Sequence, residues 1–241
     1  MTSLRHIHWS FSYAIEAESP EVIQLHSILL RASNLSSLSI RCASRLALRS
    51  QRSIFLDVPL TSLTTLEYCG DPEQLVLLHK DMPNLMHIIA TPVALDFRPI
   101  VPKLFPVLSV FGQQLKMIEF PNVAFPFNDI RSILDYCPNL HTLGYNINHV
   151  VFPKMTTVLH PSISVILLTT QKMLDNYAFE QCMVMHGETL TGEAFPALRK
   201  VVLEGSADWD VDGPQFYPAY LVMRQRFPSQ RVQGATVVWE C

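Results

Sequence analysis

The sequence predicts an α/β solenoid, a stack of similar strand–helix units that share one curved parallel sheet. The first observation is a loosened Leu-x-x-Leu-x-Leu phrase that recurs nine times along the 241 residues. Its occurrences begin at Leu4, Leu35, Leu63, Leu85, Leu115, Leu140, Ile163, Leu198 and Val232. Self-similarity at a period of about 20–50 residues is typical of a solenoid. The second observation is a set of helix start signals between the phrases.

Each phrase predicts a short strand with one buried side. In the second unit the fourth and sixth positions, Leu38 and Ile40, alternate with polar neighbours as a strand requires. The first position, Leu35 in that unit, is expected to turn into the core as the chain reaches the strand. One unit cannot bury such an apolar side alone, so neighbouring units must stack to bury it.

Three segments between the phrases carry the start signals of helices. They are Ser19–Leu30, Asp71–His79 and Asn128–Tyr136, and the first two have proline and glutamate in their first turn. Proline and an early carboxylate suit the start of a helix. Prolines such as Pro83 and Pro138 then precede the next phrase, where proline ends a helix and favours an extended chain. Strand, helix and proline turn therefore alternate along the sequence.

The segment Leu140–Val150 carries the clearest version of the repeat. It fits L-x-x-L-x-L-x-x-N-x-L, with Tyr145 in a leucine position and Asn148 in the asparagine position. Together with the preceding Cys137-Pro-Asn, it resembles the leucine-rich repeat family, most closely the divergent fungal repeats attached to F-box proteins. The resemblance implies about nine irregular repeats, with the parallel sheet on the concave side and helices on the convex side. It also implies a protein-recognition scaffold, the substrate-recognition part of an F-box-type ubiquitin-ligase receptor. The first phrase begins at Leu4, so no F-box is expected before the repeats.

Composition and patterning favour one domain that meets a protein partner. Charged residues make up 16% of the chain, against about 25% in typical domains, so much surface must be buried or covered. No linker interrupts the repeats, which predicts a single domain over residues 1–241. Its ends are apolar strands without polar caps, which suggests a fragment of a longer protein, or self-association through these uncapped ends.

The same composition argues against nucleic acid, membranes and secretion. A net charge of −3 offers no basic footprint for nucleic acid. The longest apolar run, 165–168, is far shorter than the roughly 20 residues of a membrane span. No apolar signal segment follows Arg5. The cysteines are odd in number and lack a Cys-x-x-Cys pair, which predicts reduced thiols in a cytoplasmic or nuclear protein. They are Cys42, Cys69, Cys137, Cys182 and Cys241.

Residues between the inward positions of the strands should form the concave face. Several of them are apolar where solvent would favour polar side chains, and a contiguous exposed apolar patch marks a partner site. Loops folded over these strands, or a register shifted by one residue, are the alternatives. The candidate partner-binding residues are His87, Ile89, Met117, Glu119, Val165, Leu167 and Lys200.

Three other patterns have a stronger structural than functional explanation. Asp208–Gly213 copies the first half of an EF-hand loop, but Ala219 stands where the bidentate glutamate is required, so an acidic solvated loop is favoured. Arg41, Arg45, Arg49 and Arg52 would form one stripe if their segment were helical, which favours a solvated helix face over a phosphate site. His6 and His8 share a strand face, but no third ligand has supporting spacing, so no metal is predicted.

No familiar catalytic or cofactor motif is present. The chain has no G-x-S-x-G elbow, no Walker loop and no G-x-G-x-x-G, and only 8 glycines. The sequence therefore predicts a non-catalytic scaffold without a cofactor. One alternative is an α/β enzyme with an unrecognised active site that uses Asp208, Asp210, Asp212 and His186. Another is a truncated gene product without a selected function.

Overall fold

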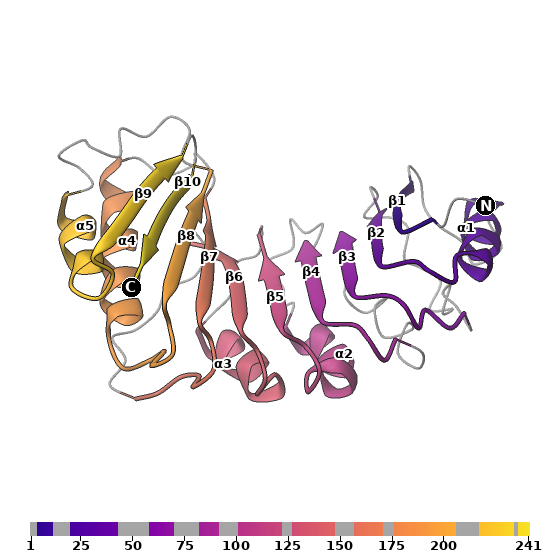
Figure 1. Cartoon of the computed structure of the whole chain (residues 1–241), viewed down its shortest axis with the longest axis horizontal. Helices are drawn as coiled ribbons and strands as arrows, with labels where there is room; N and C mark the ends of the chain where they lie inside the picture. The colour runs from indigo at the N-terminus through magenta and orange to yellow at the C-terminus, as the bar shows by residue number, and fades with distance from the viewer. Residues whose placement is uncertain are drawn as a thin grey trace. The chain divides into compact units, whose positions relative to one another are not determined.

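A computed structural model of the chain describes residues 4–11, 20–42, 58–69, 82–91, 101–121, 127–147, 157–170, 176–205, 217–233 and 236–241 (Figure 1). These residues contain ten strands and five helices. They divide into two compact units, Met1–Leu115 and Lys116–Cys241, here called unit 1 and unit 2.

Unit 1 is built of parallel strands joined by helices and connecting segments. Strands β1, β2, β3 and β4 lie side by side in chain order, and each neighbouring pair is parallel. Parallel neighbours need a crossover connection, and α1 lies in the first one. The elements are β1 (His6–Phe11), α1 (Pro20–Arg31), β2 (Ser37–Cys42), β3 (Thr65–Cys69), β4 (His87–Thr91) and α2 (Val101–Phe111).

Unit 2 continues the same pattern and ends in an antiparallel hairpin. Strands β5 to β8 are parallel in chain order, and β10 then pairs antiparallel with both β8 and β9. The last strand of the chain therefore lies inside the sheet, between β8 and β9. The elements are β5 (Met117–Phe120), α3 (Phe127–Tyr136), β6 (Thr142–Asn146), β7 (Val165–Thr169), α4 (Asn176–Thr191), β8 (Lys200–Glu204), α5 (Tyr217–Arg224), β9 (Ser229–Gln233) and β10 (Thr236–Glu240).

The strand phrases supply the core, as their alternation predicts. Leu66 and Tyr68 of β3 are buried, whereas their neighbours Thr65 and Glu67 are half-buried. The first positions of seven phrases are at most 2% exposed. These residues are Leu35, Leu63, Leu85, Leu115, Leu140, Ile163 and Leu198.

A recurring turn explains how the chain reaches each strand. The amide of the first leucine donates to the carbonyl three residues earlier, as in Leu85 to Met82 and Leu140 to Cys137. Proline suits the second position of such a turn, where its fixed φ is already correct. Leu35, Leu63 and Leu198 make the same hydrogen bond, to Ala32, Leu60 and Phe195. The proline turns predicted from the sequence are therefore present.

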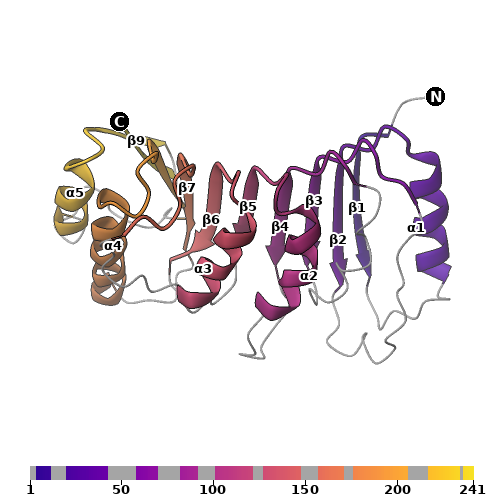
Figure 2. The same ribbon diagram turned by 90° about the horizontal axis from the view of Figure 1, so that it is seen from below.

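In unit 2, α3 and α4 lie on the same side of the sheet (Figure 2). Tyr145 of β6 points to this side, and its hydroxyl lies 3.3 Å from His186 Nδ1 of α4. Helix α5 packs on α4, where a Cβ added to Gly187 would lie 3.0 Å from Val222 Cγ1. None of the helices in the described part of the chain is both long and apolar enough to cross a membrane.

The structure confirms the α/β class and the mostly parallel sheet, and it confirms the helices predicted near 19–30 and 128–136. The helix predicted over 71–79 lies outside the described residues. The prediction of a ninth repeat at Val232 was wrong. Val232 lies in β9, is 51% exposed, and belongs to an antiparallel hairpin. The first phrase is irregular too, because Leu4 is 47% exposed.

Candidate protein-interaction surface

The alternate residues of each strand that point away from the buried core form what we call the open face of each unit. In unit 1 it comprises His6, His8, Ser10, Ser37, Ser39, Arg41, Thr65, Glu67, Cys69, His87, Ile89 and Thr91. In unit 2 it comprises Met117, Glu119, Thr142, Gly144, Asn146, Val165, Leu167, Thr169, Lys200, Val202, Glu204, Thr236, Val238, Glu240, Ser229, Arg231 and Gln233.

The open face of unit 1 is polar, and its groups bond to one another. His8 Nδ1 lies 2.8 Å from Ser39 Oγ, and His8 Nε2 lies 3.4 Å from Ser10 Oγ. Arg41 donates to Glu67 across 3.2 Å, between neighbouring strands. Paired groups of this kind fix the surface locally, and an exposed ion pair adds little to stability. This polar part of the sheet offers a partner few apolar contacts.

The open face of unit 2 carries an aliphatic strip. Leu167, Val202 and Val238 lie opposite one another on β7, β8 and β10. Val202 lies between Leu167 and Val238 on this face and is 8% exposed. Val165, which is half-buried, extends the strip along β7. Met117 of β5 lies on the same face, but Thr142 of β6 stands between it and Val165. Side chains of this type on a surface favour contact with a protein over contact with water.

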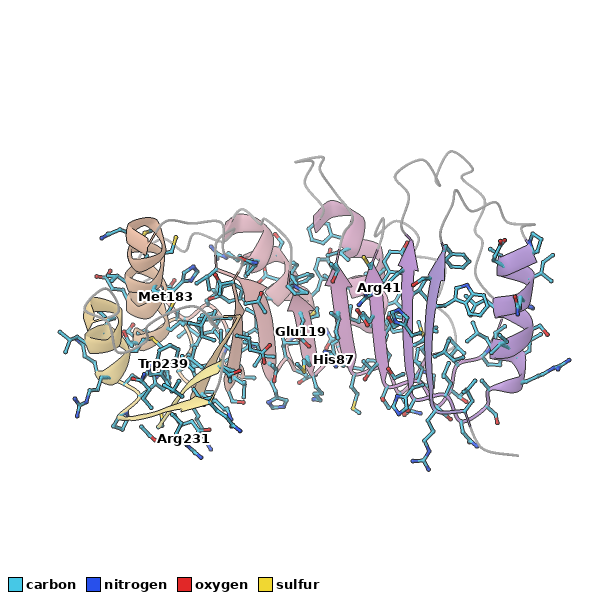
Figure 3. All side chains as sticks on the ribbon, turned by 90° about the horizontal axis from the view of Figure 1, so that it is seen from above. Arg41, His87, Glu119, Met183, Arg231 and Trp239 are labelled. Atoms are coloured by element: carbon cyan, nitrogen blue, oxygen red, sulfur yellow. The ribbon has the colours of Figure 1, made fainter. Side chains whose placement is uncertain are left out.

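Gly144 of β6 lies between Leu167 of the strip and Glu119 of β5. A Cβ at Gly144 would lie 2.8 Å from Cγ of Glu119, its cross-strand partner. The methylene groups of Glu119 therefore lie over the glycine backbone. The glycine lets a charged side chain lie flat beside the aliphatic strip (Figure 3 labels Glu119).

A three-residue charge cluster borders the strip on the other side. Lys200 Nζ lies 2.9 Å from Glu240 Oε1, and Arg231 donates to Glu240 Oε2. Hydrogen bonds from Lys200 and Arg231 lower the pKa of Glu240, so this carboxylate stays ionised. Two cations share one anion, which leaves the cluster with one net positive charge. Figure 3 shows Arg231 and Met183 of α4 on opposite sides of the sheet.

The candidate residues predicted from the sequence all lie on the open face of their unit. Met117, Glu119, Val165, Leu167 and Lys200 share that of unit 2, and Val165 is the direct cross-strand partner of Lys200. His87 and Ile89 lie on β4 in unit 1, both half-buried.

The sequence prediction missed the contribution of the terminal hairpin. Val238, Arg231 and Glu240 join this surface only because β10 turns back between β8 and β9. The dipeptide Gly234-Ala235 between two strand-like runs was the available signal, since glycine in first place favours a two-residue hairpin turn. Val202 is predicted on the same face by its alternation with Lys200 and lies there, although it is not one of the seven candidate residues.

The other sequence patterns do not assemble into a site among the described residues. Arg41 lies on strand β2, not on a helix, so it cannot belong to a helical arginine stripe, and Arg45, Arg49 and Arg52 lie outside the described residues. Residues 208–213 lie outside them too. Within the described ranges, no three histidine, cysteine or acidic side chains gather as metal ligands would.

The buried titratable groups are part of the packing. His186, proposed for an alternative enzyme, is 2% exposed and faces the Tyr145 hydroxyl. Burial raises the pKa of the Cys137 thiol to about 12, and it also raises the pKa of Cys69 and Cys182. Cys69, Cys137, Cys182 and Cys241 are free thiols. A raised pKa disfavours the nucleophilic thiolate, so Cys69, Cys137 and Cys182 are poor nucleophiles.

No protein-family model matches this chain. A search of curated proteins finds no significant match either. The resemblance to leucine-rich repeats therefore rests on the sequence phrases and the proline turns that precede them.

Proposed function

We propose that this chain is a non-catalytic protein-interaction scaffold, built as a leucine-rich-repeat solenoid, which binds a protein partner through the open faces of its sheet strands. The observation that carries the proposal is the aliphatic strip of unit 2, Leu167, Val202 and Val238, with Val165 beside it on β7. Aliphatic side chains stand there at positions where water would favour polar ones.

A repeated hydrogen-bond pattern supports the solenoid part of the proposal. At the start of a strand, two successive amides donate to one backbone carbonyl at the start of the preceding strand. Ser36 and Ser37 donate in this way to Arg5, and Ser164 and Val165 donate to His141. The same arrangement links Thr64 and Thr65 to Ser36, Met86 and His87 to Thr64, His141 and Thr142 to Lys116, and Arg199 and Lys200 to Ser164. A solenoid is a stack of similar repeats, each in contact with its neighbours, and a hydrogen-bond pattern that recurs from one strand to the next fits such a stack.

Burial of the strip by a partner would supply binding energy. Removal of apolar area from water contributes about 25 cal/mol per Å² before the costs of association are subtracted. A central apolar cluster with a charged border is also the common anatomy of a protein interface. Lys200, Glu240 and Glu119 provide such a border in unit 2.

The experiment is affinity capture from extract of the native cells, with the captured proteins quantified by mass spectrometry. We compare the parent chain with Leu167→Arg in unit 2 and Ile89→Arg in unit 1. Both residues are half-buried on the open face, so arginine can reach solvent without unfolding the strand. Circular dichroism verifies the fold of each variant. Proteins captured by the parent and lost in Leu167→Arg support the proposal.

Matched controls separate surface position from added charge. Val158→Arg in unit 2 and Val110→Arg in unit 1 add the same side chain at residues that are 55% and 46% exposed and lie off the open face. These controls should capture the same proteins as the parent. If Leu167→Arg and Ile89→Arg also capture the parent's set unchanged, the open face is not the binding surface.

The resemblance to F-box-associated repeats gives the proposal a finer form, a substrate-recognition part of a ubiquitin-ligase receptor. Ubiquitin-ligase subunits would then be recovered with the parent chain, and the substrate would be lost in Leu167→Arg. Recovery of a specific partner without any ligase subunit would keep the scaffold and remove the ligase link.

A further inference from the structure

Strand β9 is an exposed sheet edge in unit 2. Among the described residues it pairs with β10 and with no other strand. Four of its five residues, Ser229, Arg231, Val232 and Gln233, are exposed. The Arg231 side chain is 73% exposed, and Val232 is 51% exposed.

The edge lacks most of the devices that stop strand addition. Alternate residues of an edge strand direct their N–H and C=O groups away from the sheet, where another strand can bind them. Residues 229–233 contain no proline or glycine. Their one charge is Arg231, and its position decides which kind of strand fits.

Arg231 makes this edge of the sheet positively charged. It shares Glu240 with Lys200, so the cluster carries one net positive charge, and Arg231 is the member on the outermost strand. A residue of an added strand opposite Arg231 would lie about 5 Å away between Cβ atoms, where an opposite charge stabilises and a like charge destabilises. A carboxylate is therefore the matching group.

The same argument disfavours a second copy of this chain. An antiparallel pairing of β9 with itself over all five residues sets Arg231 opposite Arg231. The charges would repel, and shifted registers would lose backbone hydrogen bonds. Self-association through uncapped ends, one expectation from the sequence, is thus opposed by this residue at this edge.

We propose that the free edge of β9 binds an extended acidic segment of a partner protein by strand addition. An aspartate or glutamate of that segment lies opposite Arg231, and an apolar residue lies opposite the exposed Val232. Backbone hydrogen bonds supply affinity and the two side-chain contacts supply selectivity, as in other cases of strand addition. This surface shares Arg231 with the open face, but it binds through the backbone edge of β9 and not through the face of the sheet.

A phage-displayed library of random twelve-residue peptides, selected on the full chain, provides the probe. Enriched peptides should alternate apolar residues with aspartate or glutamate. A synthetic copy of the best one is then titrated by fluorescence anisotropy against the parent, Arg231→Glu, Arg231→Gln and Arg131→Glu. Arg131 is exposed on α3, away from the edge, and serves as the control.

Affinity should fall about fivefold or more in Arg231→Glu, to a smaller extent in Arg231→Gln, and not in Arg131→Glu. Bound peptide should slow amide hydrogen exchange in residues 229–233. The Gln variant keeps the test valid if repulsion between a new glutamate and Glu240 disturbs the hairpin. Selection of no acidic peptides, equal affinity for both Arg231 variants and the parent, or protection elsewhere in the sheet would each overturn the proposal.

Discussion

Gly205 and Gly144 both lie in close contact with neighbours, but what they touch differs. Gly205 follows β8 with φ of 91°, and an added Cβ would lie 2.7 Å from the Thr170 backbone oxygen. At Gly144 the added Cβ would meet the flexible Glu119 side chain at 2.8 Å. We expect Gly205→Ala to lower the free energy of unfolding by about 1–3 kcal/mol, because positive φ and a backbone clash act together. Gly144→Ala should cost less than about 1 kcal/mol, since Glu119 can rotate. Urea unfolding of both variants tests the order, and the reverse order would contradict this account.

Arg226 is a structural residue that the sequence pattern did not reveal. Its guanidinium, half-buried after α5, donates to the carbonyls of Leu190, Gly192, Phe195, Pro196 and Leu198. These carbonyls close α4 and the chain leading to β8. Nothing in the local sequence around residue 226 encodes acceptors about thirty positions away, because tertiary packing alone brings them together.

Replacement of Arg226 by lysine should destabilise the protein despite the conserved charge. The ammonium group is compact and cannot serve acceptors spread along a planar fork. We expect a loss of about 2–3 kcal/mol in the free energy of unfolding, since several carbonyls lose a charged donor. Arg131→Lys, on the exposed surface of α3, should change it by less than about 0.5 kcal/mol. Equal urea midpoints for the two variants would show that the Arg226 hydrogen bonds contribute little.

At the scale of elements, the alternation in β7 makes a direct prediction. Ile166 is fully buried on the helix side, whereas the next residue, Leu167, is half-buried on the open face. Ile166→Ala should cost about 3 kcal/mol, through lost burial and a cavity. Leu167→Ala should cost about 1 kcal/mol, since little of its area is removed from water. Chemical denaturation measures both, and similar losses would mean that Leu167 belongs to the core.

The strands and their turns were predictable because each is encoded locally. A phrase such as Leu140–Tyr145 carries its alternation and its proline turn within nine residues, and the structure buries Leu140, Leu143 and Tyr145 accordingly. The hairpin of β9 and β10 was not predicted, because Val232–Trp239 reads as one more phrase. Its reversal depends on the turn and on pairing with β8, which are not visible in apolar periodicity. Five of the seven candidate residues lie on the open face of unit 2, as their alternation predicts. Arg231, Val238 and Glu240 lie on the same face but were overlooked, because the hairpin that brings them there was not predicted.

At the scale of the whole molecule, stability should depend on pH through groups buried at the Cys137 turn. His160 Nε2 lies 3.0 Å from the Cys137 carbonyl, and the Ser162 amide donates to His160 Nδ1 across 3.3 Å. The two contacts require a neutral ring with its proton on Nε2. Burial lowers the pKa of His160, while burial raises the pKa of Cys137 from 9.0 to about 12.

These two shifts act on opposite sides of neutrality. Below the ordinary histidine pKa of 6.5, the unfolded chain takes up a proton that the folded chain resists, so stability falls as pH falls. Between pH 9 and about 12 the unfolded thiol ionises while the folded one does not, so stability also falls as pH rises. Each group contributes a slope of at most about 1.4 kcal/mol per pH unit. We therefore expect greatest stability between about pH 7 and 9.

Urea unfolding from pH 5 to 11, with two variants, tests how each residue contributes to the pH dependence of stability. We call the fall in stability at low pH the acid limb and the fall at high pH the alkaline limb. His160→Gln keeps one donor and one acceptor without a titrating proton, so the acid limb should flatten while the alkaline limb stays. Cys137→Ala removes one such thiol and should make the alkaline limb shallower without abolishing it, because burial also raises the pKa of Cys69, Cys182 and Tyr145. The variant should also be less stable overall, because a buried side chain becomes smaller. If His160→Gln leaves the acid limb unchanged, then other groups carry it, and the neutral ring at this turn does not set the lower bound of stability.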